Sequence, residues 1–272
     1  MTAAKKQNAN PLLLSDVDKK IVAELLLFLK NLPDNKKCDL DFLINQSKTN
    51  IIITGVLGGN IKNITVQDFT ILFDNRIFLN EISKFFRNYG KKTKNIDALL
   101  LAEKLIVACQ DFFDQPSEDF AFALATEANI KSDLAILGYD SINNFYAAIE
   151  LLQKARNDGL DPQSQEFMFV LMDEGDCWYN LAKWKNDEIS NFSKALERFD
   201  DAWDFGIEPK SDDYKKILNL KAIIQMELAK RGVNAINNCK NAINNWELLI
   251  KTNLDEKSQQ FVNYQISLAG IL

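Results

Sequence analysis

An internal repeat of 47 residues constrains the fold of this 272-residue chain more than any other feature. Ile142, Ile189 and Ile236 stand at successive steps of this length. The segments that follow these isoleucines match position by position, with apolar residues aligned on apolar residues and no gap between copies. A fixed period is typical of proteins in which each supersecondary unit buries its apolar surface against the next unit.

Two further series of residues have the same period, which makes coincidence an inadequate explanation. One series consists of single serines and the other of Leu-Ala pairs. The serines are Ser117, Ser164, Ser211 and Ser258, and the pairs occupy 134–135, 181–182 and 228–229.

Each copy has the spacing of two helices. Apolar residues of the second helix recur every three or four positions, which predicts one inward-facing stripe. In the middle copy this stripe consists of Ile189, Phe192, Ala195, Leu196, Phe199, Ala202 and Trp203. The first helix is expected to begin after the serine, whose hydroxyl caps a free backbone N–H. The second helix is expected to end at Gly159, Gly206 and Asn253, residue types that tolerate the left-handed conformation.

One position of the first helix always holds a small residue, which predicts close helix–helix approach. The four residues are Ala128, Gly175, Ala222 and Ala269. We expect a large side chain there to cost about 1–3 kcal/mol through overpacking.

These patterns predict an all-α fold of antiparallel helix pairs in a repeat domain over 65–272. The expected pairs occupy about 69–114, 117–157, 164–205 and 211–252, followed by a capping helix at 258–272. A flexible tail at 1–14 and a small helical or irregular segment at 15–64 precede them. Within that segment, 36–64 fits either a short hairpin or a loop packed on the first pair.

The middle copy resembles two families of helical-repeat proteins. Trp178, Leu181 and Ala182, with Ala195, Phe199, Ala202 and Pro209, resemble the tetratricopeptide (TPR) pattern. The end of the same copy, 195–209, is similar to the end of a pentatricopeptide repeat. The likeness covers about 95–272 and implies a right-handed α-solenoid. The TPR unit has about 34 residues, so the helices of this chain should be longer.

The resemblance to TPR proteins also implies a binding surface. In such superhelices the first helix of each pair lines the concave side, where partner proteins or peptides bind. The corresponding positions here are Asn129, Ser132, Ile136, Asp176, Tyr179, Lys183, Ile223, Met226 and Lys230. Their mixture of polar, apolar and weakly basic side chains favours a groove for a helix or an extended peptide.

Little in the sequence indicates catalysis, a cofactor or a bound metal. The chain has no histidine, which removes the commonest general base and metal ligand. The acidic cluster Asp173, Glu174 and Asp176, with Asp187 and Glu188 nearby, could hold a metal ion or a basic partner. We interpret it as a solvated helix face. The expected function is therefore non-catalytic: a regulatory or chaperone-like scaffold that binds a protein or peptide.

Charge and hydropathy narrow the partners and the compartment. The formal net charge of −6 argues against a nucleic-acid or anionic-membrane surface. RNA binding, suggested by the pentatricopeptide likeness, is the alternative function. The short apolar run at 21–29 contains Glu24 and predicts a core helix instead of a membrane span. We expect a cytoplasmic monomer or weak homodimer.

Overall fold

The computed structural model describes residues 76–252, which form eight α-helices and no strand. The helices are α6 (Arg76–Thr93), α7 (Ile96–Gln110), α8 (Glu118–Ile136), α9 (Ser141–Asp158), α10 (Gln165–Lys183), α11 (Glu188–Asp204), α12 (Asp212–Lys230) and α13 (Ala235–Thr252). The predicted tail 1–14, the segment 15–64 and the capping helix 258–272 lie outside the described residues.

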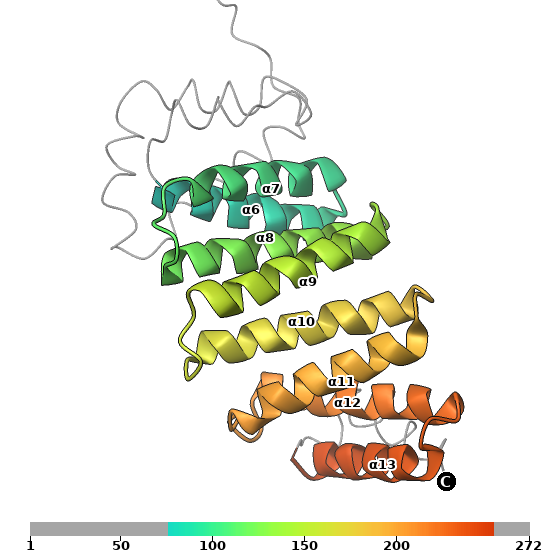
Figure 1. The fold of residues 1–272 in the computed structure, drawn as a ribbon. Coiled ribbons are helices and arrows are strands. Elements are labelled where there is room, and N and C mark those ends of the chain that lie inside the picture. Colours follow the sequence, from blue (N-terminus) through green and yellow to red (C-terminus); the bar gives the residue numbers. More distant parts are fainter. Residues whose placement is uncertain (1–75, 253–272) are drawn as a thin grey trace, which may run out of the picture. The chain divides into compact units, whose positions relative to one another are not determined.

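The described residues fall into two compact units that divide between Phe112 and Phe113. In the first unit α6 packs on α7. In the second, α8 packs on α9, α10 on α11 and α12 on α13, and each pair contacts the next through α9–α10 and α11–α12. Figure 1 shows α8 to α13 as antiparallel helices stacked in chain order. The fold is all-α and solenoid-like, as the repeat predicts.

The serines begin the first helices as expected. The hydroxyls of Ser117, Ser164 and Ser211 each accept a 3.1 Å hydrogen bond from the backbone N–H three residues later. Acidic side chains follow in the first turn of all three helices, where the positive end of the helix dipole favours them.

The turn inside each pair has the same backbone conformation in all three copies. One residue has positive φ in each turn: Gly138 (86°), Lys185 (59°) and Gly232 (78°). The residue two positions later also has positive φ: Asp140 (41°), Asp187 (37°) and Asn234 (41°). Asp and Asn tolerate this region better than most residues. Lysine does not share that tolerance, so Lys185 is the unusual residue of this series.

Both second helices end at the predicted glycines, but only one of the two glycines has the expected left-handed conformation. Gly206 follows α11 with φ of +78°, as expected for a left-handed C-terminal residue. Gly159 has φ of −169°, which is ordinary extended backbone. Glycine is required at position 159 for another reason, because a Cβ there would lie 2.3 Å from the Ser117 carbonyl oxygen. The third position, Asn253, lies outside the described residues.

The apolar stripe of the second helices forms the core, except at its N-terminal end. In α11, Phe192, Ala195, Phe199 and Ala202 are buried, while Leu196 and Trp203 are partly buried against them. Ile189 is 45% exposed, and the equivalent Ile142 and Ile236 are 41% and 72% exposed. The three isoleucines are equivalent residues at the second position of α9, α11 and α13, but the inward orientation predicted for Ile189 is wrong.

The first pair repeats this arrangement in its own unit. Leu99, Ala102, Ile106 and Cys109 of α7 are all buried, at the three- and four-residue spacing of the second-helix stripe. Ile82, Phe85 and Phe86 of α6 are buried as well.

The small-residue position lies at a tight contact, as predicted. Ala128 and Ala222 are fully buried. At Gly175 a Cβ would lie 2.9 Å from the Phe199 ring, closer than side chains normally approach. Because Phe199 is itself fully buried, its ring has little room to move.

We therefore predict that Gly175→Val lowers the free energy of unfolding by about 1–3 kcal/mol, because the added side chain must displace the Phe199 ring. Urea unfolding followed by circular dichroism measures the change. Ser193→Val, at an exposed position of α11, is the control. Equal effects of the two substitutions would contradict the close contact.

Successive pairs are joined by polar contacts whose charges are reversed. Between α9 and α10, the buried Glu174 accepts a 3.0 Å hydrogen bond from Gln153 and lies 3.4 Å from an Arg156 nitrogen. One repeat later, Lys221 occupies the Glu174 position and pairs with Asp200, which occupies the Gln153 position.

The third member of the contact changes in the same way. Trp203 replaces Arg156, and the Lys221 ammonium lies 5.2 Å from its ring centroid. A charge at this inward position is thus always partnered, as buried charges require.

We predict that Lys221→Glu destabilises the protein by about 1–2 kcal/mol, because it places a second carboxylate beside Asp200 and removes the contact with Trp203. Combining it with Asp200→Lys should restore part of the loss. Thermal unfolding of the two single variants and the double variant gives the coupling between the two sites. Additive effects would show that the pair does not interact.

Candidate functional site

The first helices α8, α10 and α12 form a common surface, which we call the first-helix face. Two hydrogen bonds cross it: Asn129 donates to Asp173 at 2.9 Å, and Lys216 donates to Asp176. The nine predicted binding residues all lie on these helices, and none is buried. The face therefore remains accessible from α8 to α12.

Several of the predicted residues hold the helices together. Asn129 and Asp176 make the bonds between helices, and Ser132 contacts the buried Cys177 thiol. Burial raises the pKa of Asp176, although the Lys216 ammonium opposes the shift. Burial alone would lower the pKa of Lys216, but the Asp176 carboxylate more than compensates and raises it.

The remaining predicted residues converge only in part. Tyr179, Lys183 and Ile223 line one hollow of about 300 Å³, which we call the Tyr179 hollow. Ile136 is 55% exposed on α8 and does not line it. Met226 packs against the core between α12 and α13, and Lys230 pairs with Glu227.

The Tyr179 hollow is built by three consecutive helices and one turn. Its apolar lining comes from Tyr179 and Ala182 of α10, Phe192 of α11 and Ile223 of α12. The Tyr179 and Phe192 rings pack together with centroids 6.1 Å apart. Burial, with smaller contributions from Glu227 and Asp176, raises the pKa of Tyr179 above its ordinary value.

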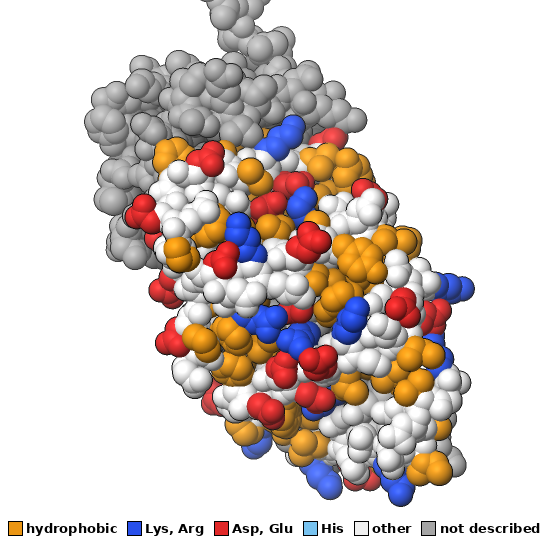
Figure 2. Space-filling model, in the orientation of Figure 1, with side chains coloured by type: hydrophobic (Ala, Val, Ile, Leu, Met, Phe, Trp, Pro, Cys, Tyr) orange, Lys and Arg blue, Asp and Glu red, His pale blue; other side chains and the backbone are white. Residues whose placement is uncertain are grey.

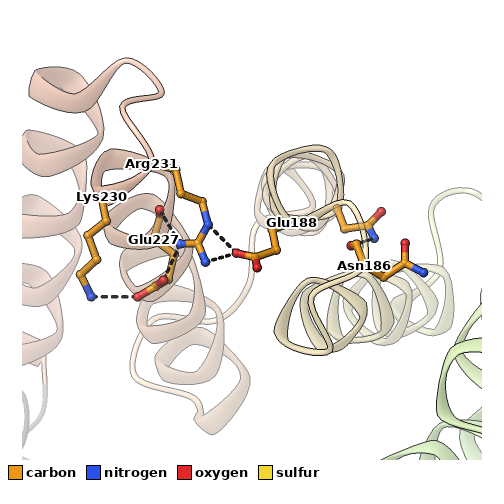
Figure 3. A network of polar contacts seen from close by, with 6 residues as sticks. Asn186, Glu188, Glu227, Lys230 and Arg231 are labelled. Carbon is orange, nitrogen blue, oxygen red and sulfur yellow. Dashed lines mark hydrogen bonds and ion pairs between the residues drawn. The ribbon is translucent and has the colours of Figure 1, made fainter.

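Arg231 closes one side of this hollow by joining two helices (Figure 3). Its Nε donates to Glu188 at the start of α11 at 2.7 Å, and Nη2 contacts the same oxygen. Its Nη1 donates to the Glu227 carboxylate at 2.6 Å, and Lys230 donates to that carboxylate at 2.8 Å. The guanidinium also lies 5.2 Å from the Phe192 ring centroid.

These contacts leave the rim of the hollow with a positive surplus. The charges of Glu188 and Glu227 are balanced by those of Arg231 and Lys230. Lys183 and Lys185 also line the hollow, and both side chains are exposed. Neither has a carboxylate within ion-pair distance in residues 76–252, and the Lys183 ammonium lies 5.3 Å from the Tyr179 ring centroid.

The sequence prediction missed six residues of this site: Ala182, Lys185, Glu188, Phe192, Glu227 and Arg231. Five lie off the predicted positions of the first helix, and Phe192 was assigned only to the core. A signal was present in the repeat, because Arg231 aligns with Leu137 and Trp184, and Lys185 aligns with two glycines. Such a change of chemistry at a fixed turn position marks a surface that differs between copies.

The acidic cluster on α10 was predicted to be a solvated helix face, and this prediction is wrong. Glu174 is 2% exposed and contacts Gln153 and Arg156. Asp173, Asp176 and Glu188 interact with partners on α8, α12 and the end of α12 respectively. Over residues 76–252, no three Cys, Asp or Glu side chains are grouped so that they could hold a metal ion.

Exposed apolar side chains also gather at the edge that carries the turns within each pair. They include Tyr139, Ile142, Trp184, Ile189 and Ile236. Figure 2 shows hydrophobic groups at intervals along this edge, on the right, among charged groups of both signs.

No protein-family model and no curated protein sequence matches the chain. None of the helices in the described range combines the length and apolarity needed to cross a lipid bilayer.

The contacts around Glu227 predict a pH-dependent contribution to stability. The Lys230 hydrogen bond, partly opposed by burial and reinforced by Arg231, lowers the pKa of Glu227 from its ordinary 4.5. A carboxyl with a lowered pKa stabilises the fold above its unfolded pKa, and the contribution disappears as the pH falls through the folded value. Glu227→Gln should therefore cost about 1 kcal/mol at neutral pH and nothing in strong acid.

Urea unfolding at neutral and acidic pH measures this difference between Glu227→Gln and the parent chain. Glu150→Gln, at an exposed position of α9, is the control and should change stability at neither pH. A loss for Glu227→Gln that is the same at both pH values would contradict the charged contact.

Proposed function

We propose that this protein is a non-catalytic scaffold whose first-helix face binds a segment of a partner protein. The observation that carries the proposal is the Tyr179 hollow, where an apolar floor and a charged rim lie together on an accessible surface. A large apolar contact surrounded by polar groups is typical of the residues that dominate protein–protein affinity.

The repeated architecture supports this proposal. Three equivalent helix pairs repeat, on α8, α10 and α12, the positions that the TPR resemblance assigns to a binding surface. A face built from successive repeats offers a long surface that a helix or extended peptide can follow. The chemistry of that face also differs from pair to pair, with Ile136, Lys183 and Lys230 at equivalent positions.

We favour a binding function over a catalytic one because the carboxylates near the first-helix face are engaged in ion pairs. The carboxylates of Glu174, Glu188 and Glu227 are engaged by Arg156, Arg231 and Lys230. The contacts of Arg156 and Arg231 join neighbouring helices and that of Lys230 lies within α12, so each has a structural role. We accordingly assign the first-helix face to binding.

Site-specific photo-crosslinking tests the proposal. The photoreactive amino acid p-benzoylphenylalanine replaces Ile136 or Phe169, which are exposed on α8 and α10. Irradiation in cells that contain the protein should join a partner protein to these two positions. Controls carry the same amino acid at Glu150 or Asn244, which are exposed on the second helices α9 and α13.

The pattern of cross-links decides between the functions. Protein cross-links at the first-helix positions and not at the controls support the proposal. Cross-links only at the second-helix positions contradict the assignment of the face. Cross-links to RNA at Ile136 or Phe169 would favour the alternative function, RNA binding.

A further inference from the structure

We propose that the Tyr179 hollow binds an acidic peptide segment that inserts one large apolar side chain. The apolar side chain contacts Tyr179, Phe192 and Ile223, and flanking carboxylates of the segment pair with Lys183 and Lys185. This inference rests on the proposed function, because it names the class of partner segment that the first-helix face receives.

The size and lining of the hollow suit one apolar side chain. Its volume of about 300 Å³ is at the lower end of the range for ligand pockets, which is about 300–1,000 Å³. The lining rings of Tyr179 and Phe192 are already fixed against each other, so an inserted side chain would meet a preformed surface.

The uncompensated charge of the site is positive. Glu188 and Glu227 are neutralised by Arg231 and Lys230, which leaves the Lys183 and Lys185 ammonium groups at the rim. These two charges stand out in a chain whose net charge is −6. An acidic ligand is complementary to this rim, and a basic ligand would be repelled by it.

A second hollow of similar size shows that this charge pattern is specific. It measures about 340 Å³ and lies at the turns that join successive pairs, with Met168, Phe205 and Ile207 in its lining. Its charged residues are Glu208 and Asp213, and no lysine or arginine lines it. An apolar hollow in this fold therefore does not by itself bring cations to its rim.

Lys185 also differs from the equivalent residues of the other two turns. The other two copies have glycine at this place, with φ of +86° at Gly138 and +78° at Gly232. Lys185 has φ of +59°, a conformation that disfavours residues with a Cβ. Lys94 and Lys210 also have positive φ, so it is the place of Lys185 at the rim of the apolar hollow, and not its conformation alone, that fits a role in binding.

Peptide selection on the full chain tests the ligand class. A phage-displayed library of random peptides is selected on the immobilised protein. Enriched sequences should combine several Asp or Glu residues with one Phe, Leu, Ile, Met or Trp. Enrichment of basic sequences, or of no sequence, overturns the inference.

Fluorescence anisotropy with an enriched peptide then tests each part of the recognition. Replacing its apolar residue with Ser, or its acidic residues with Lys, should weaken binding at least about tenfold. Affinity for the original peptide should also fall as salt rises, because exposed charges are screened. A peptide that tolerates either replacement contradicts the proposed mode.

Matched lysine variants locate the site. The double variant Lys183→Glu with Lys185→Glu should weaken binding about tenfold or more, since it reverses both charges. Its control is Lys154→Glu with Lys210→Glu. Lys154 is exposed and lies 5.2 Å from the Phe120 ring centroid, much as Lys183 lies beside Tyr179. Lys210 is exposed with φ of +74°, much like Lys185. Equal losses in the two double variants overturn the assignment.

A glycine substitution separates binding from folding. Lys185→Gly should raise the melting temperature, because glycine adopts positive φ without strain. It should also lower the affinity for the peptide, because it removes one positive charge. Lys210→Gly should raise the melting temperature and leave the affinity unchanged. Unchanged affinity in Lys185→Gly would remove this lysine from the site.

The two proposals fail in different ways. If the segment that cross-links to Ile136 or Phe169 replacements is basic or wholly polar, the inference about the ligand is wrong and the binding function stands. If those positions give no protein cross-link, the binding function itself fails.

Discussion

The contact between successive helix pairs is the constraint on which the second unit depends. A single pair of helices cannot bury both of its apolar sides, so α9 must pack on α10 and α11 on α12. Within a pair the two helices also approach closely, because a small residue such as Gly175 of α10 faces Phe199 of α11. Polar groups between successive pairs are partnered, with Glu174 and Lys221 carrying opposite charges at equivalent places. Since the two charges differ in sign, each interface matches its own neighbour better than the other one.

The repeated backbone gives the chain constant places for variable side chains. The residue that ends the first helix is Leu137, Trp184 or Arg231, depending on the pair. The conformation of the turn that follows is the same in each case. Of the pairs α8–α9, α10–α11 and α12–α13, only the last holds a guanidinium at this place, which crosses to Glu188 of α11 and forms one wall of the Tyr179 hollow. The site therefore belongs to the junction of α10–α11 with α12–α13, although all three pairs share the scaffold.

The sequence predicted correctly those features that depend on residues a few positions away in the chain. It failed for features that depend on residues distant in the sequence. The capping serines and the buried stripe of α11 depend on neighbours three or four residues away, which a period reveals. Gly159 was misread because its requirement comes from the Ser117 carbonyl, which lies 42 positions earlier in the chain. Ile189 was assigned to the core because periodicity cannot show where the neighbouring helix ends. Lys185 and Arg231 were missed because a hollow formed by three helices has no local pattern.

The same residues that open a binding site also limit its stability. Arg231 and Lys230 neutralise the carboxylates at the end of α12, and this leaves Lys183 and Lys185 as the only charges of the hollow without a partner in the described part of the chain. Lys185 has no ion pair that would offset its positive φ, and a glycine there would remove the strain. The equivalent place in the other two turns holds glycine. Lys185 makes no ion pair within residues 76–252 and lies at the rim of the Tyr179 hollow, which supports the proposal that it pairs with an acidic segment.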